Sequence, residues 1–389
     1  MKVAITNYWF KTGGTENAMI GMVNELLKHG AEVTIVSYFD EGDLKSRIPK
    51  EVKYETIEHT FLKDAWMRDY SRNIILQVIQ KVIHKLSQVF GKTYGENHNL
   101  YDKVLSKTKE NPTEFDLVLD FFGYGHFMTA YAAKKIRARK KATWLHDENT
   151  SFAGRVRKYY DDYDAIFCVS NAVREDLLKR YPELESKTDV LYNFLDIDRI
   201  RTKSEEDCIS TEDFNSKFCL LTAGRLTEQK GYDIAIKATE ILKNKGLDFN
   251  WFVLGQGKER ESLEALIRKC NVEDRFHLLG NVSNPFPYMK KCDLYVQPSR
   301  HEGYCTTLVE AKTLCKAILS SNIGSAREVL KEGETGYMCE LTPEDLAEAI
   351  ERLMNDRELI SKVETNLASE KAYNSEDYKK IEKLMEGNS

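Results

Sequence analysis

The stretch LYVQPSRHEGYCTTLVEAK, residues 294–312, decides the fold class of this 389-residue chain. Its first four residues have the pattern of a short buried strand, and Pro298 and Gly303 break that pattern with a loop. Residues 306–316 then show helical spacing. In an open parallel sheet, ligands bind where such strands end, and the next helix offers unpaired N–H groups to an anion.

Two glutamates lie in this segment, Glu302 within the loop and Glu310 on the helix that follows. A carboxylate in the loop and another on the helix can bind vicinal sugar hydroxyls while backbone N–H groups hold phosphate. The pattern therefore predicts a sugar-nucleotide site. An ordinary loop glutamate beside a solvated helix glutamate is the alternative, and the pair by itself does not exclude it.

A second strand-loop-helix segment, LTAGRLTEQKGYD at residues 221–233, carries Arg225 and Lys230 in its loop. Arginine offers a planar fork of donors and lysine a mobile point charge, so together they can neutralise a departing diphosphate. Taken alone they would be ordinary surface cations. The order of the elements around them favours the phosphate role.

Strand and helix patterns alternate along the chain in two series of similar size, which predicts two Rossmann-like doubly wound α/β domains facing a cleft. A polar stretch at 203–216 is expected to be a surface loop. We expect domains at 1–195 and 196–365, and a C-terminal helix at 366–389 that crosses back to the first domain. Strands are expected at 3–6, 33–36, 117–121, 142–145, 165–169, 190–192, 219–223, 250–254, 276–278, 294–297 and 317–320. Helices are expected at 15–29, 172–180 (capped by Ser170 or Asn171), 232–244, 259–270, 288–291 and 306–316.

Composition narrows the function classes. Lys plus Arg number 57 against 62 for Asp plus Glu, and the net charge of −5 gives no overall attraction to nucleic acid. The first residues lack a signal-peptide pattern and no run of 18 apolar residues occurs, so we expect a cytoplasmic protein. The eight cysteines contain no C-x-x-C pair, which indicates reduced thiols, and Cys305 in the site loop is expected to pack.

Other nucleotide and metal motifs fit poorly. Gly255 and Gly257 begin a dinucleotide fingerprint, but the third glycine would fall at Arg260, and no P-loop motif exists. Residues 161–164 and 196–198 mimic a metal-binding D-x-D signature, and we expect neither to bind metal because one ends a helix and the other lies at the domain junction.

The motifs AGRLTEQKG at 223–231, GQG at 255–257 and EGYCTTLVEA at 302–311 together resemble the retaining glycosyltransferases of the fourth family, which include bacterial capsule and lipopolysaccharide transferases. GGTE at 13–16, WLHD at 144–147 and VLYNFLD at 190–196 match in the same order. The resemblance implies the GT-B arrangement, in which two Rossmann-like domains face a cleft.

It also implies retaining transfer of a hexosyl group from a nucleoside diphosphate sugar to a saccharide or lipid-linked saccharide, in cell-surface polysaccharide synthesis. UDP-sugar is the preferred donor, with GDP-mannose as the alternative, and neither a cofactor nor a metal is expected. The reaction expected is front-face substitution, in which the leaving phosphate takes the acceptor proton. A non-catalytic partner subunit and a nucleotide-sugar epimerase of similar build are the competing functions.

Under this resemblance, Arg225 and Lys230 stabilise the leaving diphosphate, Glu302 binds the transferred sugar and Glu310 binds the ribose. His146, at the end of the strand 142–145, can bond a sugar hydroxyl, whereas a capped loop histidine is the alternative. The other expected donor contacts are Gly14, Gly255, Gly257, Gly303, Tyr304, Cys305, Thr306 and Asn193, and the expected acceptor contacts are Gly13, Thr15, His146 and Asp147.

Two further features lie in the first domain. Gly13 and Gly14 are expected to end the first strand and permit close backbone approach to the substrates, although a plain turn would also use a glycine. Between residues 69 and 91 an apolar helical face alternates with Arg72, Lys81 and Lys85. Such a helix either packs against the sheet or attaches the protein peripherally to an anionic membrane surface.

Overall fold

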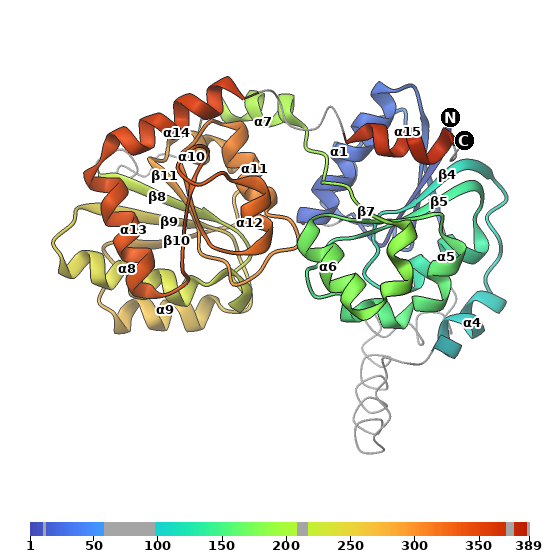
Figure 1. Cartoon of the computed structure of the whole chain (residues 1–389), viewed down its shortest axis with the longest axis horizontal. Helices are drawn as coiled ribbons and strands as arrows, with labels where there is room; N and C mark the ends of the chain where they lie inside the picture. Colours follow the sequence, from blue (N-terminus) through green and yellow to red (C-terminus); the bar gives the residue numbers. More distant parts are fainter. Residues whose placement is uncertain (11–12, 58–97, 208–216, 371–376, 387–389) are drawn as a thin grey trace, which may run out of the picture. The chain divides into compact units, whose positions relative to one another are not determined.

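The computed structural model describes residues 1–10, 13–57, 98–207, 217–370 and 377–386. These residues form two compact units (Figure 1): Met1–Leu195 with Glu376–Ser389, and Asp196–Ser375. The basic helix expected between residues 69 and 91 falls outside the described residues. Within the described part, helix α14 (Arg357–Ser369) belongs to the second unit and helix α15 (Tyr378–Glu386) to the first.

The first unit is built on a seven-stranded parallel sheet in the order β3-β2-β1-β4-β5-β6-β7. Helix α1 packs closely on the segment that follows β7. A Cβ added at Gly21 of this helix would lie 2.0 Å from the carbonyl oxygen of Phe194. The strands are β1 Lys2–Asn7, β2 Glu32–Ser37, β3 Lys53–Thr56, β4 Glu114–Asp120, β5 Arg137–Leu145, β6 Ala165–Cys168 and β7 Thr188–Val190. The helices are α1 Gly14–Lys28, α4 His98–Ser106, α5 Phe127–Lys135, α6 Asn171–Arg180 and α15, with 3-10 turns η1 Asp43–Arg47, η3 Thr150–Arg155, η4 Arg157–Asp162 and η5 Pro182–Lys187.

The second unit has a six-stranded parallel sheet in the order β10-β9-β8-β11-β12-β13. Helix α8 packs against α9 and α13, while α11 packs against α10 and α12 (Figure 1). The strands are β8 Phe218–Ala223, β9 Phe249–Leu254, β10 Phe276–Gly280, β11 Leu294–Gln297, β12 Ile318–Ser321 and β13 Tyr337–Cys339. The remaining elements are α7 Ile197–Ser204, η7 Glu228–Lys230, α8 Tyr232–Asn244, α9 Arg260–Lys269, α10 Phe286–Lys291, α11 Thr306–Thr313, α12 Gly324–Val329 and α13 Pro343–Asn355.

Each sheet reverses its strand order once. The first unit adds β2 and β3 on one side of β1 and then β4 to β7 on the other, so its order reverses between β1 and β4. In the second unit the reversal falls between β8 and β11. Loops diverge to opposite faces at such a point, and this is where open α/β sheets bind ligands. The expected architecture of two Rossmann-like parallel-sheet domains is confirmed.

The burial of the central strands explains the apolar runs from which they were predicted. All residues of β8, β9, β11 and β12 are buried, as expected of parallel strands covered by helices on both faces. The indole of Trp251 on β9 donates to the hydroxyl of Thr222 on β8 at 3.0 Å, so even the polar core atoms are paired. Ser170 accepts a hydrogen bond from the Val173 N–H and thereby caps α6, as one of the two expected residues.

Several expected boundaries are wrong. Strand β1 ends at Asn7, so Gly13 and Gly14 do not end it but form the N-cap and first residue of α1. Helix α11 stops at Thr313 rather than at residue 316, because Cys315 adopts a positive φ of 56° that no helix continues. The stretch expected as loop from residue 203 begins inside α7, and its residues 208–216 lie outside the described part.

Helix α7 and the acidic turn before β6 also differ from the sequence-based expectation. The Asp196 side chain accepts a hydrogen bond from the Arg199 N–H at 3.0 Å and so caps α7, a helix that the sequence did not predict. Asp161 and Asp162 end the 3-10 turn η4 rather than an amphipathic α-helix, and Tyr163 and Asp164 follow that turn.

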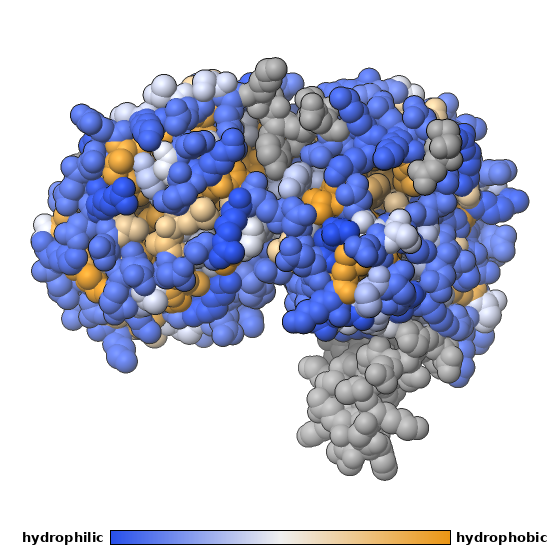
Figure 2. All heavy atoms as spheres, in the orientation of Figure 1, coloured by the Kyte–Doolittle hydropathy of each residue, from blue (hydrophilic) through white to orange (hydrophobic). Residues whose placement is uncertain are grey.

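Large hydrophobic side chains are rarely exposed on the described surface. Among the described residues, Met1 is the one large hydrophobic side chain with high exposure, at 41%. Hydrophilic side chains dominate the face seen in Figure 2. No helix within the described ranges is long and apolar enough to cross a bilayer.

Candidate active site

The loops after β8 and β11 bring two of the predicted residues into contact. Lys230 Nζ lies 2.6 Å from Glu302 Oε1, and the two side chains are only 12% and 11% exposed. The strands that carry these loops are neighbours in the sheet at the point where its order reverses. A cation and a carboxylate thus lie together where an anionic sugar donor would enter a parallel sheet.

A buried polar network fixes Glu302. Its Oε1 also accepts hydrogen bonds from Ser299 Oγ at 2.7 Å and from Gln297 Nε2 at 3.2 Å. Gln297 and Ser299 are both fully buried. The Oε1 atom of Gln297 in turn accepts from the hydroxyls of Tyr295 and Thr307, each at 3.0 Å. The carboxylate therefore keeps its position when Lys230 turns to another anion.

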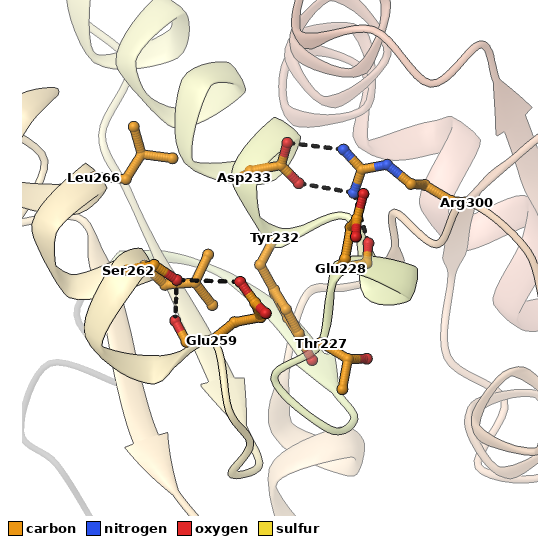
Figure 3. Close-up of a pocket in the computed structure, with 9 residues that line it drawn as sticks. Thr227, Glu228, Tyr232, Asp233, Glu259, Ser262, Leu266 and Arg300 are labelled. Atoms are coloured by element: carbon orange, nitrogen blue, oxygen red, sulfur yellow. Dashed lines mark hydrogen bonds and ion pairs between the residues drawn. The ribbon is translucent and has the colours of Figure 1, made fainter. Parts of the chain in front are cut away.

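Arg300 clamps the two loops together. Its guanidinium donates two bonds of 2.8 Å to the Asp233 carboxylate and one of 2.6 Å to the Glu228 carbonyl (Figure 3). Its backbone N–H donates to the Gln229 carbonyl at 2.7 Å, and Gln229 Nε2 donates to the His301 carbonyl at 2.9 Å. This pairing lowers the pKa of Asp233 and raises that of Arg300. Neither Arg300 nor Asp233 was predicted from the sequence.

Two glycines are required by this geometry. Gly231 has φ +66°, and a Cβ added there would lie 1.9 Å from the Pro298 carbonyl oxygen. Gly255 has φ +150°, and a Cβ there would lie 1.9 Å from the Gly224 carbonyl oxygen. Side chains at either position would push the loops apart. The first of these glycines closes the Lys230 loop onto the Glu302 loop, and the second closes the β9 loop onto the β8 loop.

The other predicted donor residues lie around the same edge. Arg225 is exposed in the loop after β8, and its side chain has no hydrogen-bond or ion-pair partner within the described ranges. Glu310 is half-buried on α11. A Cβ at Gly257 would lie 2.2 Å from the Leu226 carbonyl oxygen, which again brings the β9 loop against the β8 loop. The remaining four precede or begin α11, with Gly303, Tyr304 and Cys305 buried and Thr306 half-buried.

Cys305 packs as expected. It is 1% exposed, and its Sγ lies 3.3 Å from Ser325 Oγ.

A cavity of about 280 Å³ adjoins the clamp. It is bounded by the start of α8, by α9 and by the Arg300 side chain (Figure 3), and neither Lys230 nor Glu302 lines it. The cavity is thus a separate feature from the Lys230–Glu302 pair.

In the first unit, His146 lies at the end of β5, as the sequence predicted. Its Nε2 lies 2.8 Å from the Phe121 carbonyl oxygen, so this nitrogen carries the proton and donates it. The Nδ1 atom is buried and has no hydrogen-bond partner among the described residues. Burial lowers the pKa of His146 to about 3. The imidazole is therefore neutral near pH 7, and Nδ1 is an acceptor without a donor.

The other residues predicted in the first unit have mixed surroundings. A Cβ at Gly13 would lie 2.3 Å from Glu16 Oε2, whereas one at Gly14 would meet no atom within 4 Å. Thr15 Oγ1 lies 2.7 Å from the Tyr124 hydroxyl, and Asp147 accepts from the Asn149 N–H at 3.0 Å. Asn193 is 4% exposed, and its Oδ1 atom lacks a partner in the described part of the chain.

Carboxylates in both D-x-D-like stretches are engaged by neighbouring groups of the protein. Asp161 pairs with Arg157 at 2.9 Å and Asp164 with Lys140 at 3.1 Å, while Asp196 caps α7. Within the described ranges, no three His, Cys, Asp or Glu side chains are grouped as a metal ion requires.

The fold and the matching family models define the class of protein. Two Rossmann-like parallel-sheet domains are the architecture of the GT-B glycosyltransferases. The family model described as "Glycosyltransferase Family 4" matches residues 12–199, and that described as "Glycosyl transferases group 1" matches residues 204–369. The chain belongs to this group 1, GT4-like family of glycosyltransferases.

Its relatives act in glycan synthesis. The chain is 30% identical over 202 residues to N-acetylgalactosamine-N,N'-diacetylbacillosaminyl-diphospho-undecaprenol 4-alpha-N-acetylgalactosaminyltransferase of Campylobacter jejuni, covering 51% of this chain and 53% of that protein. It is 23% identical to the amylovoran biosynthesis glycosyltransferase AmsK of Erwinia amylovora, covering 87% of this chain and 86% of the relative. The first of these matches spans about half the length of the relative.

The fold has counterparts among solved structures. The crystal structure of Anabaena HepE in complex with UDP and glucose superposes with a TM-score of 0.68 at 18% identity, covering 94% of this chain and 93% of that chain. At this level of identity the similarity shows the shared fold.

Proposed function

We propose that the protein is a retaining, metal-independent hexosyltransferase that moves a sugar from a nucleoside diphosphate donor to a saccharide or lipid-linked saccharide. The observation that carries this proposal is the Lys230–Glu302 contact of 2.6 Å at the reversal point of the second sheet. A donor of this kind has a diphosphate to neutralise and sugar hydroxyls to orient, which are the tasks that a cation and a fixed carboxylate perform.

The two charges can act at the same time. A lysine ammonium has three donors, so Lys230 can keep one bond to Glu302 while it donates to the diphosphate. The Oε1 atom of Glu302 already accepts three bonds, and Oε2 accepts none from the described residues. Oε2 is therefore the atom that binds hydroxyls of the transferred sugar, and the exposed Arg225 supplies the second cation for the leaving diphosphate.

Retention follows from front-face substitution in this proposal. The bond from the anomeric carbon to the diphosphate oxygen breaks as the acceptor hydroxyl attacks from the same face, and the leaving phosphate oxygen takes the acceptor proton. Lys230 and Arg225 stabilise the charge that develops on the diphosphate as it leaves. Glu310 on α11 binds the ribose diol, and no separate enzyme nucleophile takes part.

The relatives favour particular substrates. The HepE crystal structure is a complex with UDP, which supports UDP-sugar over the alternative GDP-mannose. The name of the Campylobacter jejuni relative contains a diphospho-undecaprenol-linked saccharide, which supports a lipid-linked acceptor, and that of AmsK refers to amylovoran biosynthesis. We therefore infer a role in cell-surface polysaccharide synthesis on the cytoplasmic side, with peripheral attachment to an anionic membrane surface.

A transfer assay tests this proposal. Purified protein should transfer radiolabelled sugar from one of the common UDP-sugars to undecaprenyl-diphosphate saccharides in EDTA, with the anomeric configuration of the donor kept in the product. GDP-mannose serves as the second donor in the panel. Release of a UDP-sugar epimer without transfer, or complete dependence on an added divalent cation, would contradict the proposal.

A further inference from the structure

Aromatic rings gather at the reversal point of the first sheet. Five of these rings form a continuous group, which we call the aromatic platform; Trp9 follows β1, Phe122, Tyr124 and His126 follow β4, and Phe152 follows β5. Tyr124 lies at its centre, with ring centroids 5.1 Å from Phe122, 6.3 Å from His126 and 5.8 Å from Phe152. The Trp9 and Phe122 centroids are 6.4 Å apart.

The rings of the platform are partly exposed to solvent and pack on buried aromatic rings below. Trp9, Tyr124, His126 and Phe152 are each half-buried, whereas Phe122 is only 7% exposed. Below them Tyr8 is 1% exposed, and its ring centroid lies 5.5 Å from Phe122 and 5.1 Å from His126. Aromatic rings held in this way offer fixed apolar faces at a small cost in side-chain entropy.

Polar atoms border the platform. The Trp9 indole donates to Glu16 Oε1 at 3.0 Å, and the Tyr124 hydroxyl is paired with Thr15, so both rings are held in place. The His146 ring centroid lies 5.9 Å from that of Tyr124. His146 is only 8% exposed, and its Nδ1 is the unpaired buried acceptor described above. A buried acceptor without a donor costs free energy unless a ligand supplies one.

The charges nearby restrict what the platform can bind. Three acidic side chains lie beside it, Glu16 in the first turn of α1 and Asp147 and Glu148 after β5, and Arg155 is an exposed cation at the far end of η3, three residues beyond Phe152. A phosphorylated or carboxylated ligand would meet repulsion there. An uncharged pyranose has the complementary surface, since one face of the ring presents C–H groups and its edge presents hydroxyl donors.

We propose that the aromatic platform is a saccharide site, at which an uncharged pyranose ring of the acceptor stacks on Trp9 and Tyr124 and donates a hydroxyl hydrogen bond to His146 Nδ1. This inference rests on the proposed function and extends it, because it assigns the acceptor's recognition to an apolar ring face. The donor is recognised by charge in the second unit and the acceptor by stacking in the first.

Saturation-transfer NMR tests the site directly. The probes are the methyl β-glycosides of glucose, galactose, N-acetylglucosamine and N-acetylgalactosamine, mixed singly with the full-length protein. Wild-type protein should transfer saturation to the ring hydrogens of one pyranose face of at least one probe. Trp9→Ala and Tyr124→Ala should each weaken that probe's binding by up to about tenfold, since one aromatic stacking contact contributes roughly that factor.

Conservative variants separate stacking from folding. Trp9→Phe and Tyr124→Phe keep a ring and should bind the probe within about twofold of wild type. Tyr181→Ala removes another half-buried aromatic of the first unit, at the C-cap of α6, and should leave probe binding unchanged. Binding that survives both alanine substitutions would overturn the assignment, as would the absence of saturation transfer from all four probes to wild-type protein.

UDP titration distinguishes this failure from failure of the proposed function. The Trp9 and Tyr124 variants should bind UDP in the second unit with wild-type affinity. If UDP binds normally and the Trp9 and Tyr124 substitutions leave probe binding unchanged, only the aromatic site is refuted. Absence of UDP binding in wild-type protein would instead refute the donor site on which the function rests.

Discussion

Replacing Arg300 with alanine removes the clamp between the two loops that carry Lys230 and Glu302. Three hydrogen bonds disappear, two to Asp233 and one to the Glu228 carbonyl. The Lys230–Glu302 contact and the bond from Gln229 to His301 remain. The variant therefore tests whether those remaining contacts alone keep the ammonium and the carboxylate in place.

The expected loss of stability is small. The Arg300 and Asp233 side chains are 31% and 39% exposed, so screening by water reduces their pairing to about 1 kcal/mol. The hydrogen bond to the Glu228 carbonyl adds about 1 kcal/mol. A loss of about 2 kcal/mol leaves a domain of ordinary stability folded. Because a shift of about 1 Å can cost about a hundredfold in rate and two contacts persist, we expect kcat to fall about tenfold.

The assay compares kcat and KM for UDP-sugar in Arg300→Ala, Arg300→Lys and the exchanged pair Arg300→Asp with Asp233→Arg. Lysine lacks the planar fork and should recover only part of kcat, and the exchanged pair should recover some of it. Arg275→Ala is the matched control, because Arg275 pairs with Asp248 at 3.0 Å just before β10 begins, away from the site. A folded Arg300→Ala with unchanged kcat would refute the positioning role.

Two further predictions concern single residues. Glu310→Ala should weaken binding of free UDP, whereas Glu302→Ala should spare UDP binding and lower transfer; calorimetry showing equal losses in both variants would make this division of roles wrong. Because burial lowers the pKa of His146 to about 3, while an unfolded histidine titrates near 6.5, the unfolded state takes up the proton first as pH falls below 6.5. Wild type should therefore lose about 2 kcal/mol more unfolding free energy than His146→Gln between pH 7 and pH 5 in urea titrations, and parallel losses would contradict the burial.

The sequence predicts the buried strands well and the exposed elements poorly. Strand β8 is buried along its whole length and therefore appears as an apolar run that only Thr222 interrupts. Edge strand β3, with sequence KYET, and the three-residue β13 give no such run and were not predicted. Helix α7 buries only Ile200 and Ser204 among its eight residues, so its polar sequence resembles a loop.

For the site residues, positions at strand ends could be predicted, whereas contacts between loops could not. Lys230 and Glu302 were predicted because each follows a recognisable strand, but their contact joins residues 72 positions apart. That contact depends on β8 lying next to β11, which spacing along the chain does not reveal. Arg300 lies in the loop that the sequence predicts to form the site, yet its partner Asp233 lies on α8. The aromatic platform was not predicted, since aromatic residues near strand ends usually belong to the core.

The measurement that tests the central claim most directly is calorimetric titration of UDP, combined with transfer kinetics, for wild type, Arg225→Ala and Lys230→Ala. If the reversal point between β8 and β11 is the donor diphosphate site, wild type binds UDP, and each variant stays folded and loses about a hundredfold or more in kcat. Wild-type protein that does not bind UDP, or a folded variant with near-normal turnover, would contradict the account.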